Sequence, residues 1–381
     1  MTKPKLIRLT TVPISLEKLL TGQLHFMSSF YEVVAVSSDK SRLEKIGAQE
    51  NVRTFHLEMS RKITPINDFI AVIKLFLFLR KENPTIVHTH TPKAGIVGML
   101  AAALAGVPNR YHTVAGMPLL EATGFKRKVL NFVEKMTYAC ATKIYPNSRG
   151  LTDIILANNF CKAEKLKVLA NGSSNGIDTS YFNPELYSDT QKATLRKQLT
   201  MAQDDFVFVF VGRLVADKGI NELVVAFEQL SAEHPKIKLL LVGDYEADLD
   251  PLSAETLSVI KNNQAIISVG FQNDVRPYLA ISDALAFPSY REGFPNVVMQ
   301  AGAMGLPAIV SDINGCNEII KEGENGLIIP VKNSNALLKA MKKITEQNEV
   351  THILREKARA MIVNRYEQRL VWQAILAEYK S

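Results

Sequence analysis

The sequence predicts an α/β protein made of two Rossmann-like, doubly wound domains. Short runs rich in β-branched and aromatic residues alternate with helical patterns almost from end to end, which is typical of parallel sheets covered by helices. The chain has 381 residues, a comfortable length for two domains. A stretch rich in Asn, Gly and Ser at residues 171–187 interrupts the alternation, and we interpret it as the linker.

The expected elements fall into two series, one on each side of this linker. The expected strands of the first series are Leu6–Val12, Tyr31–Ser37, Val52–Leu57, Thr85–His90, Asn109–Val114, Lys143–Asn147 and Lys167–Ala170. Those of the second series are Phe206–Val211, Lys238–Val242, Ala265–Val269, Ala284–Ser289, Ala308–Ser311 and Gly326–Val331. The chain ends in expected helices at Ala336–Ile344, His352–Val363 and Leu370–Tyr379. We expect domains at residues 1–178 and 179–364, with ligands in a cleft at the carboxyl ends of the strands.

Composition and charge describe a globular chain. Hydrophobic residues make up 47% of the sequence and charged residues 22%. Cys140, Cys161 and Cys316 are widely spaced and odd in number, which indicates neither a disulfide framework nor a zinc motif and fits a reducing cytoplasm. The first residues lead into a strand without an apolar secretory segment, so no signal peptide is expected. The net charge of +7 is spread along the chain and suits anionic substrates or an anionic membrane surface.

The stretch at residues 283–309 carries the densest chemical signal. It is typical of a strand, a tight loop, a helix beginning at Pro295 and a second strand. Pro295 suits the first helical position, and Phe294 before it cannot cap the helix. The amides of Asn296 and Val297 are then available to an anion at the positive end of the helix dipole, which predicts a phosphate site.

Two further side chains belong to this predicted site. Glu292 stands just before the helix, and Gln300 lies one turn beyond Asn296 on the same helix face. We therefore expect a carboxylate, available amides and a polar stripe to converge on one pocket. Glu292 could instead cap a loop or form a surface ion pair.

A second motif, VGRLVADKGI at residues 211–220, follows a continuous apolar run typical of a strand buried on both faces. Gly212 allows the backbone to turn at the strand end. Arg213 and Lys218 are then the fixed cations nearest the carboxyl end of the sheet, and both suit phosphate oxygens. Such cations stabilise a departing diphosphate more in the transition state than in the ground state. Taken alone, they could also be ordinary loop cations.

These motifs resemble those of the retaining, nucleotide-sugar-dependent glycosyltransferases of family four, which have the two-domain GT-B architecture. The family signature is a Glu, seven residues and a second Glu, in a context similar to EGFPNVVLEAMACGLPVI. Glu292 keeps the first Glu, whereas Gln300 stands at the second. The match extends to Gly293, Phe294, Pro295, Gly305 and Pro307.

The resemblance implies a donor site built from both motifs. Glu292 would contact the donor sugar and shape charge at the anomeric centre, and Arg213 and Lys218 would clamp the diphosphate. Gln300 would hold the nucleotide ribose, with one acceptor and additional donors in place of a carboxylate. The implied donor-binding residues are Gly212, Arg213, Lys218, Glu292, Gly293, Phe294, Pro295, Asn296, Val297 and Gln300. The family also implies no metal, and a C-terminal helix, here within residues 365–381, that crosses back onto the first domain.

The N-terminal half carries three histidines close to predicted strand ends. His88 and His90 fall on the same face of one strand, and His112 lies on another. Together they invite a zinc interpretation, but no Cys, Asp or Glu stands close by in sequence to complete a site, and satisfied or solvated histidines are commoner. His112 loosely matches a family position near the donor sugar, so it joins Glu292, Arg213 and Lys218 as a candidate catalytic residue.

Two weaker signals complete the search for a site. The family's usual Gly-Gly loop after the first strand is absent, and Thr10, Thr11 and Ser15 are candidates to line the acceptor side. Asp248 and Asp250 have the spacing of a metal-dependent glycosyltransferase site, but that site belongs to a different, single-domain architecture. A solvated loop is the better interpretation of this pair.

Two segments bear on membranes. Ile66–Leu79 is apolar almost all round but is far short of the roughly 20 residues that span a bilayer, so a helix packed against the sheet is expected. The segment 125–136, FKRKVLNFVEKM, puts Lys126, Arg127 and Lys128 beside an apolar stripe. This pattern suits a helix on anionic headgroups and equally suits a solvated helix face. No basic stretch interleaved with aromatics indicates nucleic acid.

The resemblance implies a retaining hexosyltransferase or N-acetylhexosaminyltransferase. It would move a sugar from a nucleoside diphosphate sugar to a hydroxyl of a lipid-linked glycan, for a bacterial surface polysaccharide or capsule. The expected nucleotide is UDP. Such an enzyme would work in the cytoplasm, peripherally at the inner face of the cytoplasmic membrane. Two alternatives stay open. One is a GT-B nucleotide-sugar epimerase, and the other is a non-catalytic GT-B partner subunit, which only Gln300 favours.

Overall fold

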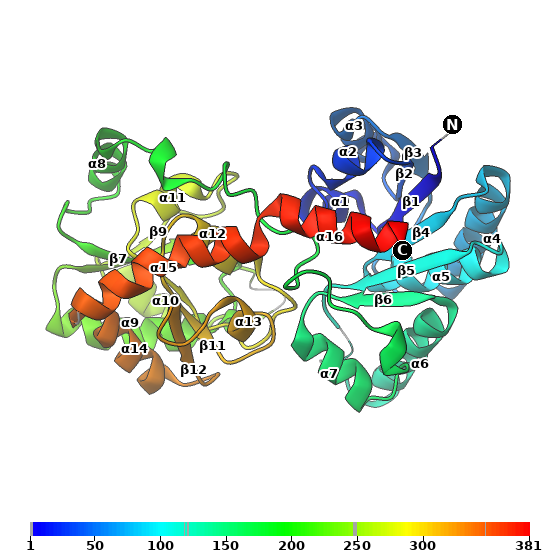
Figure 1. The fold of residues 1–381 in the computed structure, drawn as a ribbon. Helices are drawn as coiled ribbons and strands as arrows, with labels where there is room; N and C mark the ends of the chain where they lie inside the picture. Colours follow the sequence, from blue (N-terminus) through cyan, green and yellow to red (C-terminus); the bar gives the residue numbers. More distant parts are fainter. Residues whose placement is uncertain (1–2, 118, 120–121, 247–249, 347) are drawn as a thin grey trace. The chain divides into compact units, whose positions relative to one another are not determined.

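The computed structural model describes residues 3–117, 119, 122–246, 250–346 and 348–381. The chain divides into two compact units, each built on its own sheet (Figure 1). Unit 1 is Met1–Gly176 with Gln368–Ser381, and unit 2 is Ile177–Glu367. The boundaries thus fall at 176/177 and 367/368, where the sequence pattern predicted 178/179 and 364/365.

The sheet of unit 1 has six parallel strands in the order β3-β2-β1-β4-β5-β6. Successive residues of a strand point to opposite faces, so Ile7 and Leu9 enter the core on one face and Leu6 the core on the other. Because both faces are covered, β2 (EVVAVS) is mostly apolar, whereas β4 and β5 also bury His88, His90 and His112. Their bounds are β1 Lys5–Leu9, β2 Glu32–Ser37, β3 Arg53–His56, β4 Ile86–His90, β5 Asn109–Val114 and β6 Lys143–Pro146.

Two helical layers cover this sheet. The core on one face includes side chains of α4 to α7, and the core on the other face includes side chains of α1, α2, α3 and α16. The bounds are α1 Pro13–Leu19, α2 Gln23–Ser28, α3 Lys40–Glu50, α4 Pro65–Glu82, α5 Pro92–Leu104, α6 Gly124–Cys140, α7 Arg149–Ala157 and α16 Gln368–Lys380. The last helix of the chain therefore belongs to unit 1, where Trp372 packs on Phe26 of α2.

The sheet of unit 2 also has six parallel strands, in the order β12-β11-β10-β7-β8-β9. Its central strands are buried on both faces, and Phe210 of β7 stacks on Phe287 of β10 with ring centroids 5.8 Å apart. The strand bounds are β7 Phe206–Val211, β8 Ile237–Val242, β9 Ile266–Ser268, β10 Ala284–Phe287, β11 Ala308–Ser311 and β12 Gly326–Ile329.

The helices of unit 2 cover this second sheet. Helix α9 packs against α10 and α14, and α12 packs against α15. The bounds are α8 Asp189–Gln198, α9 Ile220–Glu233, α10 Ala254–Asn262, α11 Arg276–Ala280, α12 Asn296–Ala303, α13 Cys316–Ile319, α14 Ser334–Glu346 and α15 Asn348–Tyr366. Both units are thus doubly wound sheets, as the sequence predicted.

Two local expectations are wrong. Lys167–Ala170 is not a strand, because this segment meets the edge strand β6 only through one bridge, at Leu166, and then turns at Ala170, whose φ is 50°. Pro295 is not the first helical residue. Its ψ of 112° is extended, so Pro295 is the N-cap and α12 begins one residue later, at Asn296.

Helix α4 is the segment that was expected to pack against the sheet, and one of its faces does so. Ala71, Val72, Leu75 and Leu79 are buried in the core that α4 shares with α5 and β4. In the part of the chain that the structure describes, no helix combines the length and apolar character needed to cross a membrane.

Candidate donor site in unit 2

The strand order of unit 2 reverses between β7 and β10. From β7 the chain proceeds outward through β8 and β9, whereas from β10 it proceeds the other way through β11 and β12. Open α/β sheets bind ligands outside the carboxyl ends of their strands at such a switch point. The loop after β7 carries Lys218, and the loop after β10 carries Glu292. Both predicted motifs therefore meet at the place where the topology favours a ligand.

A tight turn holds Lys218 beside the end of β10. The residues Ala216–Lys218 form one 3₁₀ turn, labelled η4, and Gly219 then adopts a φ of 72° before α9 begins. A Cβ on Gly219 would stand 2.1 Å from the carbonyl oxygen of Pro288. Since no side chain fits there, glycine is what lets the two loops touch.

Lys218 and Glu292 form an ion pair at this contact. The Lys218 Nζ binds Glu292 Oε1, and each side chain is only 16% exposed. The hydroxyl of Ser289, which is fully buried, donates to the same carboxylate oxygen at 2.9 Å. The Glu292 carboxylate is therefore held in a defined position by one cation and one hydroxyl, both largely shielded from water.

The thiol of Cys316 lies close to this ion pair. Burial raises the pKa of Cys316 well above its usual value, and the Glu292 charge raises it further while Lys218 acts in the opposite sense. The thiol therefore stays protonated at neutral pH, and it packs as a small apolar group rather than serving as a nucleophile.

Arg213 points to a different partner. Its Nη1 donates to Glu246 Oε2 at 2.8 Å, and both side chains are partly exposed. The hydrogen bond with Glu246 raises the pKa of Arg213, and the charges of Asp217 and Glu292 raise it further. Lys218 thus pairs with Glu292, as both motifs are brought together. Arg213, the second cation of the predicted diphosphate clamp, instead pairs with Glu246, which lies outside both sequence motifs.

The loop before α12 is anchored from a neighbouring loop. Asn314 Nδ2 donates to the carbonyl oxygens of Glu292 and Gly293, at 2.6 and 3.2 Å. A Cβ on Gly315 would stand 2.5 Å from the Gly293 oxygen, so the two loops lie in direct contact. These contacts fix the position of Glu292 from the backbone side. They also position Phe294, which is buried against Tyr366.

The N-terminus of α12 has no side-chain cap. Pro295 makes no capping hydrogen bond, while its carbonyl accepts from the Val298 amide at 3.2 Å. The first helical residue, Asn296, is exposed, and Val297 and Gln300 are partly exposed. Asn296 and Gln300 are one helical turn apart, as predicted, so their side chains share a face. The first turn keeps its positive dipole end without a protein carboxylate as its cap.

The three N-terminal histidines belong to unit 1 and are buried. The rings of His88 and His90 stack at 4.4 Å on one face of β4. His88 contacts the Tyr379 hydroxyl, and His90 Nε2 accepts from the Arg8 guanidinium at 2.9 Å. Burial lowers the pKa of both imidazoles well below the usual value, and the Arg8 charge lowers both further.

His112 lies on β5 in a different environment. Its Nδ1 is 2.8 Å from the Thr89 hydroxyl, the residue is 3% exposed, and burial lowers its pKa to about 4. His112 is therefore a neutral imidazole at pH 7. Its catalytic role stays a prediction.

The predicted acceptor-side residues follow β1, at the switch point of unit 1 between β1 and β4. Thr10, Thr11 and Ser15 are buried, and the Thr11 hydroxyl is 2.7 Å from that of Thr91. Thr91 has a φ of 74°, which is rare for a β-branched residue. Such backbone strain is found most often at functional sites.

Metal-ligating side chains do not gather in the described part of the chain, where no group of three or more His, Cys, Asp and Glu residues could hold an ion. Asp248 of the Asp-x-Asp pair lies outside the described residues. The Asp250 carboxylate accepts from the Asp217 amide at 2.6 Å, which is a structural role.

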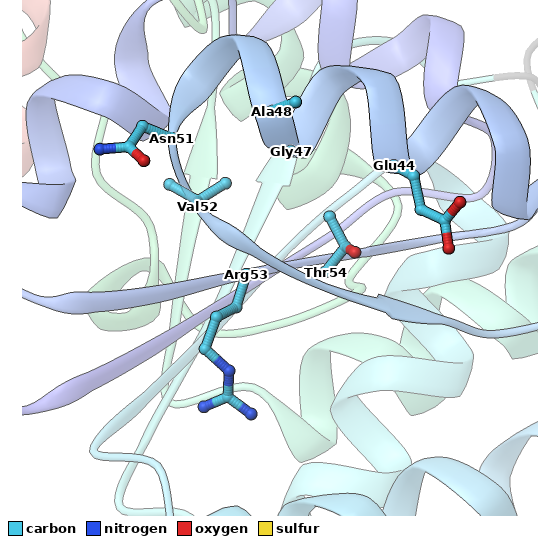
Figure 2. Close-up of a pocket in the computed structure, with 7 residues that line it drawn as sticks. All are labelled: Glu44, Gly47, Ala48, Asn51, Val52, Arg53 and Thr54. Atoms are coloured by element: carbon cyan, nitrogen blue, oxygen red, sulfur yellow. The ribbon is translucent and has the colours of Figure 1, made fainter.

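A surface pocket of about 430 Å³ lies in unit 1, between α3 and β3 at the edge of its sheet (Figure 2). Its lining includes Glu44, Asn51 and Thr54, while the Arg53 side chain points away from α3 and pairs with Glu32 and Glu82. We assign it no catalytic role.

Ser289, Asn314 and Glu246 complete the site, and sequence reasoning missed them. Ser289 ends a predicted strand three residues before Glu292, which is a usable signal for a hydroxyl near that carboxylate. Asn314 and Glu246 come from loops after other strands. Only the packing of the sheet brings those loops to the switch point.

Comparison with solved structures defines the class of fold. The chain matches HepE of Anabaena in complex with UDP, at 19% identity over 99% of each chain and a TM-score of 0.82. It also matches a glycosyltransferase of Rickettsia africae, at 18% identity over 100% of this chain and 98% of that one, with a TM-score of 0.83. The two doubly wound units therefore have the GT-B fold.

Sequence comparison places the chain within that class. Residues 191–361 match the model of glycosyl transferases group 1, and residues 25–172 match that of a glycosyl transferase 4-like domain. The capsular polysaccharide biosynthesis glycosyltransferase CapM of Staphylococcus aureus is 30% identical over all of this chain and 98% of its own. An Escherichia coli UDP-Gal:alpha-D-GlcNAc-diphosphoundecaprenol alpha-1,3-galactosyltransferase is 31% identical over 83% of this chain and 80% of its own. The protein belongs to the group 1 glycosyltransferases.

Proposed function

We propose that this glycosyltransferase moves a hexose or N-acetylhexosamine from a UDP-sugar to a hydroxyl of a lipid-linked glycan, with retention at the anomeric carbon, during surface-polysaccharide synthesis. Three relatives support the acceptor class and the pathway. CapM acts in capsular polysaccharide biosynthesis, and the Escherichia coli enzyme and a Campylobacter jejuni enzyme are named for undecaprenol-diphosphate-linked acceptors. The structural relative HepE was solved with UDP, which supports the choice of nucleotide.

The observation that carries the proposal is the Lys218–Glu292 ion pair at the β7/β10 switch point. In the proposed reaction, the bond between the anomeric carbon and the diphosphate breaks, and negative charge grows on the leaving phosphate. Lys218 is already fixed beside that position, so it stabilises the developing charge without reorganisation. Glu292 lies on the sugar side and interacts with the positive charge that develops at the anomeric centre.

The remaining donor contacts follow from α12 and the β7 loop. The amides of Asn296 and Val297 and the dipole of α12 receive a phosphate, and the Gln300 side chain hydrogen-bonds the ribose hydroxyls. The backbone from Gly293 to Pro295 shapes the approach to this helix, as does Gly212 at the end of β7. Arg213 joins Lys218 on the diphosphate after it leaves Glu246. His112, from unit 1, is proposed to approach the donor sugar as a neutral imidazole.

The proposed reaction needs no metal ion. Arg213, Lys218 and the dipole of α12 can together stabilise the negative charge of a departing diphosphate, in place of a divalent cation. Turnover in the presence of EDTA should therefore equal turnover with added Mg²⁺ or Mn²⁺. A loss of activity in EDTA that Mn²⁺ restores would contradict this assignment.

The site of action is proposed to be the inner face of the cytoplasmic membrane, where a lipid-linked acceptor presents its glycan. The protein would contact that surface peripherally, through side chains that lie at its own surface. Anionic phospholipid is the expected partner because the chain carries a net charge of +7.

One assay tests the activity. The purified protein is incubated with a panel of nucleotide sugars, with and without an undecaprenyl-diphosphate-linked acceptor, and release of nucleoside diphosphate is followed. We expect one UDP-sugar to give release that rises strongly with the acceptor. No release with any donor, together with no UDP binding in calorimetry, would contradict the proposal and support a non-catalytic partner subunit, the alternative that Gln300 favours.

A further inference from the structure

The outward face of α4 exposes five large apolar side chains. Ile66 is 77% exposed, Phe69 66% and Leu77 60%, and Ile70 and Ile73 are also exposed. Monomeric proteins rarely leave so many large apolar groups on one face of one helix. We refer to these five residues as the α4 strip.

The fold prevents the α4 strip from turning inward. Ile66, Ile70, Ile73 and Leu77 are separated by four, three and four residues, so they form one seam along the helix. The opposite side of α4 is fixed in the core of unit 1 and packs against α5. Both sides of the helix are apolar, so one side is buried in the core while the other remains exposed at the surface.

The exposed charged side chains of α4 are all positive. Lys74, Arg80 and Lys81 are exposed and flank the seam. The two acidic residues of the helix, Asp68 and Glu82, are each bound to a basic side chain of unit 1. Hydrogen bonds from Arg53 and Lys5 lower the pKa of Glu82 to about 2, so this carboxylate stays ionised and paired with these two side chains. The exposed surface of α4 therefore combines apolar groups with cations.

We propose that the α4 strip is the surface by which the protein lies on an anionic phospholipid bilayer. The apolar seam enters the boundary between headgroups and acyl chains, while the flanking cations lie among the headgroup phosphates. A second copy of the chain fits this surface poorly, since pairing two α4 helices would bring cations against cations. The assignment does not depend on the donor chemistry of unit 2. It adds to the proposed function a means of reaching a lipid-linked acceptor.

The helix that the sequence pattern favoured for this role, α6, is a weaker candidate. Arg127 donates to the carbonyl oxygen of Leu119 at 2.7 Å and to the side-chain oxygens of Asn131 and Asn158. This cation therefore supports the fold of unit 1 and is not available to headgroups. Helix α6 still exposes Phe125 and Phe132, but α5 lies between it and α4, and its apolar groups are fewer.

Co-sedimentation with vesicles tests the assignment. The native protein is compared with Ile66→Gln/Phe69→Gln/Leu77→Gln, which removes apolar groups with a residue that favours helix. A second variant, Lys74→Gln/Lys81→Gln, removes only charge. The matched control, Leu186→Gln/Leu257→Gln, replaces exposed leucines of unit 2. Vesicles contain phosphatidylcholine alone or with phosphatidylglycerol, at low and high salt.

We expect the native protein and the control to bind the anionic vesicles, with binding that falls as salt rises. The apolar variant should bind at least roughly tenfold more weakly at every salt concentration. The charge variant should keep weak binding and lose most of its salt dependence. UDP affinity and Trp372 fluorescence should stay unchanged in all variants, which shows that each unit is folded.

Two outcomes would overturn the assignment. One is binding of the apolar variant that equals native binding, with both units folded. The other is a native dimer in light scattering that the apolar variant converts to a monomer, because the strip would then be an interface between copies. A failure of the proposed activity looks different: nucleotide-sugar turnover would be absent while vesicle binding followed the pattern above.

Discussion

At the scale of single residues, Gln300 is the position where this chain departs from the signature it otherwise follows. If Gln300 hydrogen-bonds the ribose of the donor, Gln300→Glu should keep or improve UDP affinity. Gln300→Ala should weaken UDP binding by about 1 kcal/mol, the net contribution of a typical hydrogen bond. Isothermal calorimetry measures both changes. Equal UDP affinity in the native protein and in Gln300→Ala would remove this side chain from the donor site.

Glu246 is the residue that holds Arg213 in the free protein. If Arg213 binds the donor diphosphate, as proposed, the diphosphate must compete with this carboxylate for the Arg213 guanidinium. Glu246→Gln keeps a hydrogen-bond acceptor but removes the charge, so UDP should bind more tightly, by about 0.5–1 kcal/mol on the scale of exposed ion pairs. Titration of UDP into both proteins at two salt concentrations checks this. Unchanged or weaker binding in Glu246→Gln would place Arg213 away from the phosphates.

The sequence predicted part of this site and could not predict the rest. Lys218 and Glu292 each follow a buried apolar run, so their place at the carboxyl end of the sheet could be foreseen. The pairing of Arg213 with Glu246 could not be predicted, because it depends on how the loop after β8 packs beside the loop after β7. The burial of His112 against Thr89 likewise follows from tertiary packing.

At the scale of elements, the turn that ends in Gly219 positions Lys218. Gly219→Ala places a Cβ 2.1 Å from the Pro288 oxygen at a φ of 72°. Gly323 is the matched control, since its φ is 73° and a Cβ there would meet no atom of a more distant residue within 4 Å. We expect Gly323→Ala to cost roughly 1 kcal/mol of stability through backbone strain alone. Gly219→Ala should cost about 1–3 kcal/mol more and should lower kcat, because the loop must move.

Calorimetric unfolding of both variants measures the loss of stability, and steady-state kinetics measures the change in kcat. If Gly219→Ala and Gly323→Ala lost equal stability and kept equal kcat, the contact between the two loops would not position Lys218.

The elements themselves were largely predictable. Strands such as β7 and β11 appear at their expected bounds, because an unbroken apolar run has few alternatives in a parallel sheet. The segment at Lys167–Ala170 was misassigned because a short run at a sheet edge has little pairing to stabilise it. The outer face of α4 could not be predicted, since a helix that is apolar all round gives no sequence signal for which side is buried.

At the scale of the whole molecule, the buried histidines of unit 1 make its stability depend on pH. His88, His90 and His112 have folded-state pKa values below that of an unfolded histidine, chiefly through burial, and for His112 the value is about 4. As pH falls below about 6.5, the unfolded chain binds protons that the folded chain does not. Stability is therefore fully present above that pH and is lost toward pH 4, by up to about 1.4 kcal/mol per pH unit for each histidine.

Denaturant unfolding followed by fluorescence tests this pH dependence. The chain has one tryptophan, Trp372, and it lies in unit 1. The midpoint should fall from pH 7 to pH 5, and His112→Gln should reduce the slope. Burial raises the pKa of Glu134, so this carboxyl group changes stability with pH in the opposite sense. Its single contribution is smaller than that of the three histidines together. A midpoint that stayed constant over this range would show that these histidines do not titrate as the burial of unit 1 requires.

The proposed function depends on Lys218 stabilising the charge of the departing diphosphate. The most direct measurement is kcat for Lys218→Ala with the native donor and acceptor, beside Lys236→Ala, whose lysine forms an exposed ion pair elsewhere in unit 2. We predict that kcat falls by one to three orders of magnitude in Lys218→Ala, on the scale of about 3 kcal/mol for one electrostatic stabiliser, and stays unchanged in Lys236→Ala. An unchanged kcat in a folded Lys218→Ala protein would show that Lys218 does not stabilise the leaving diphosphate.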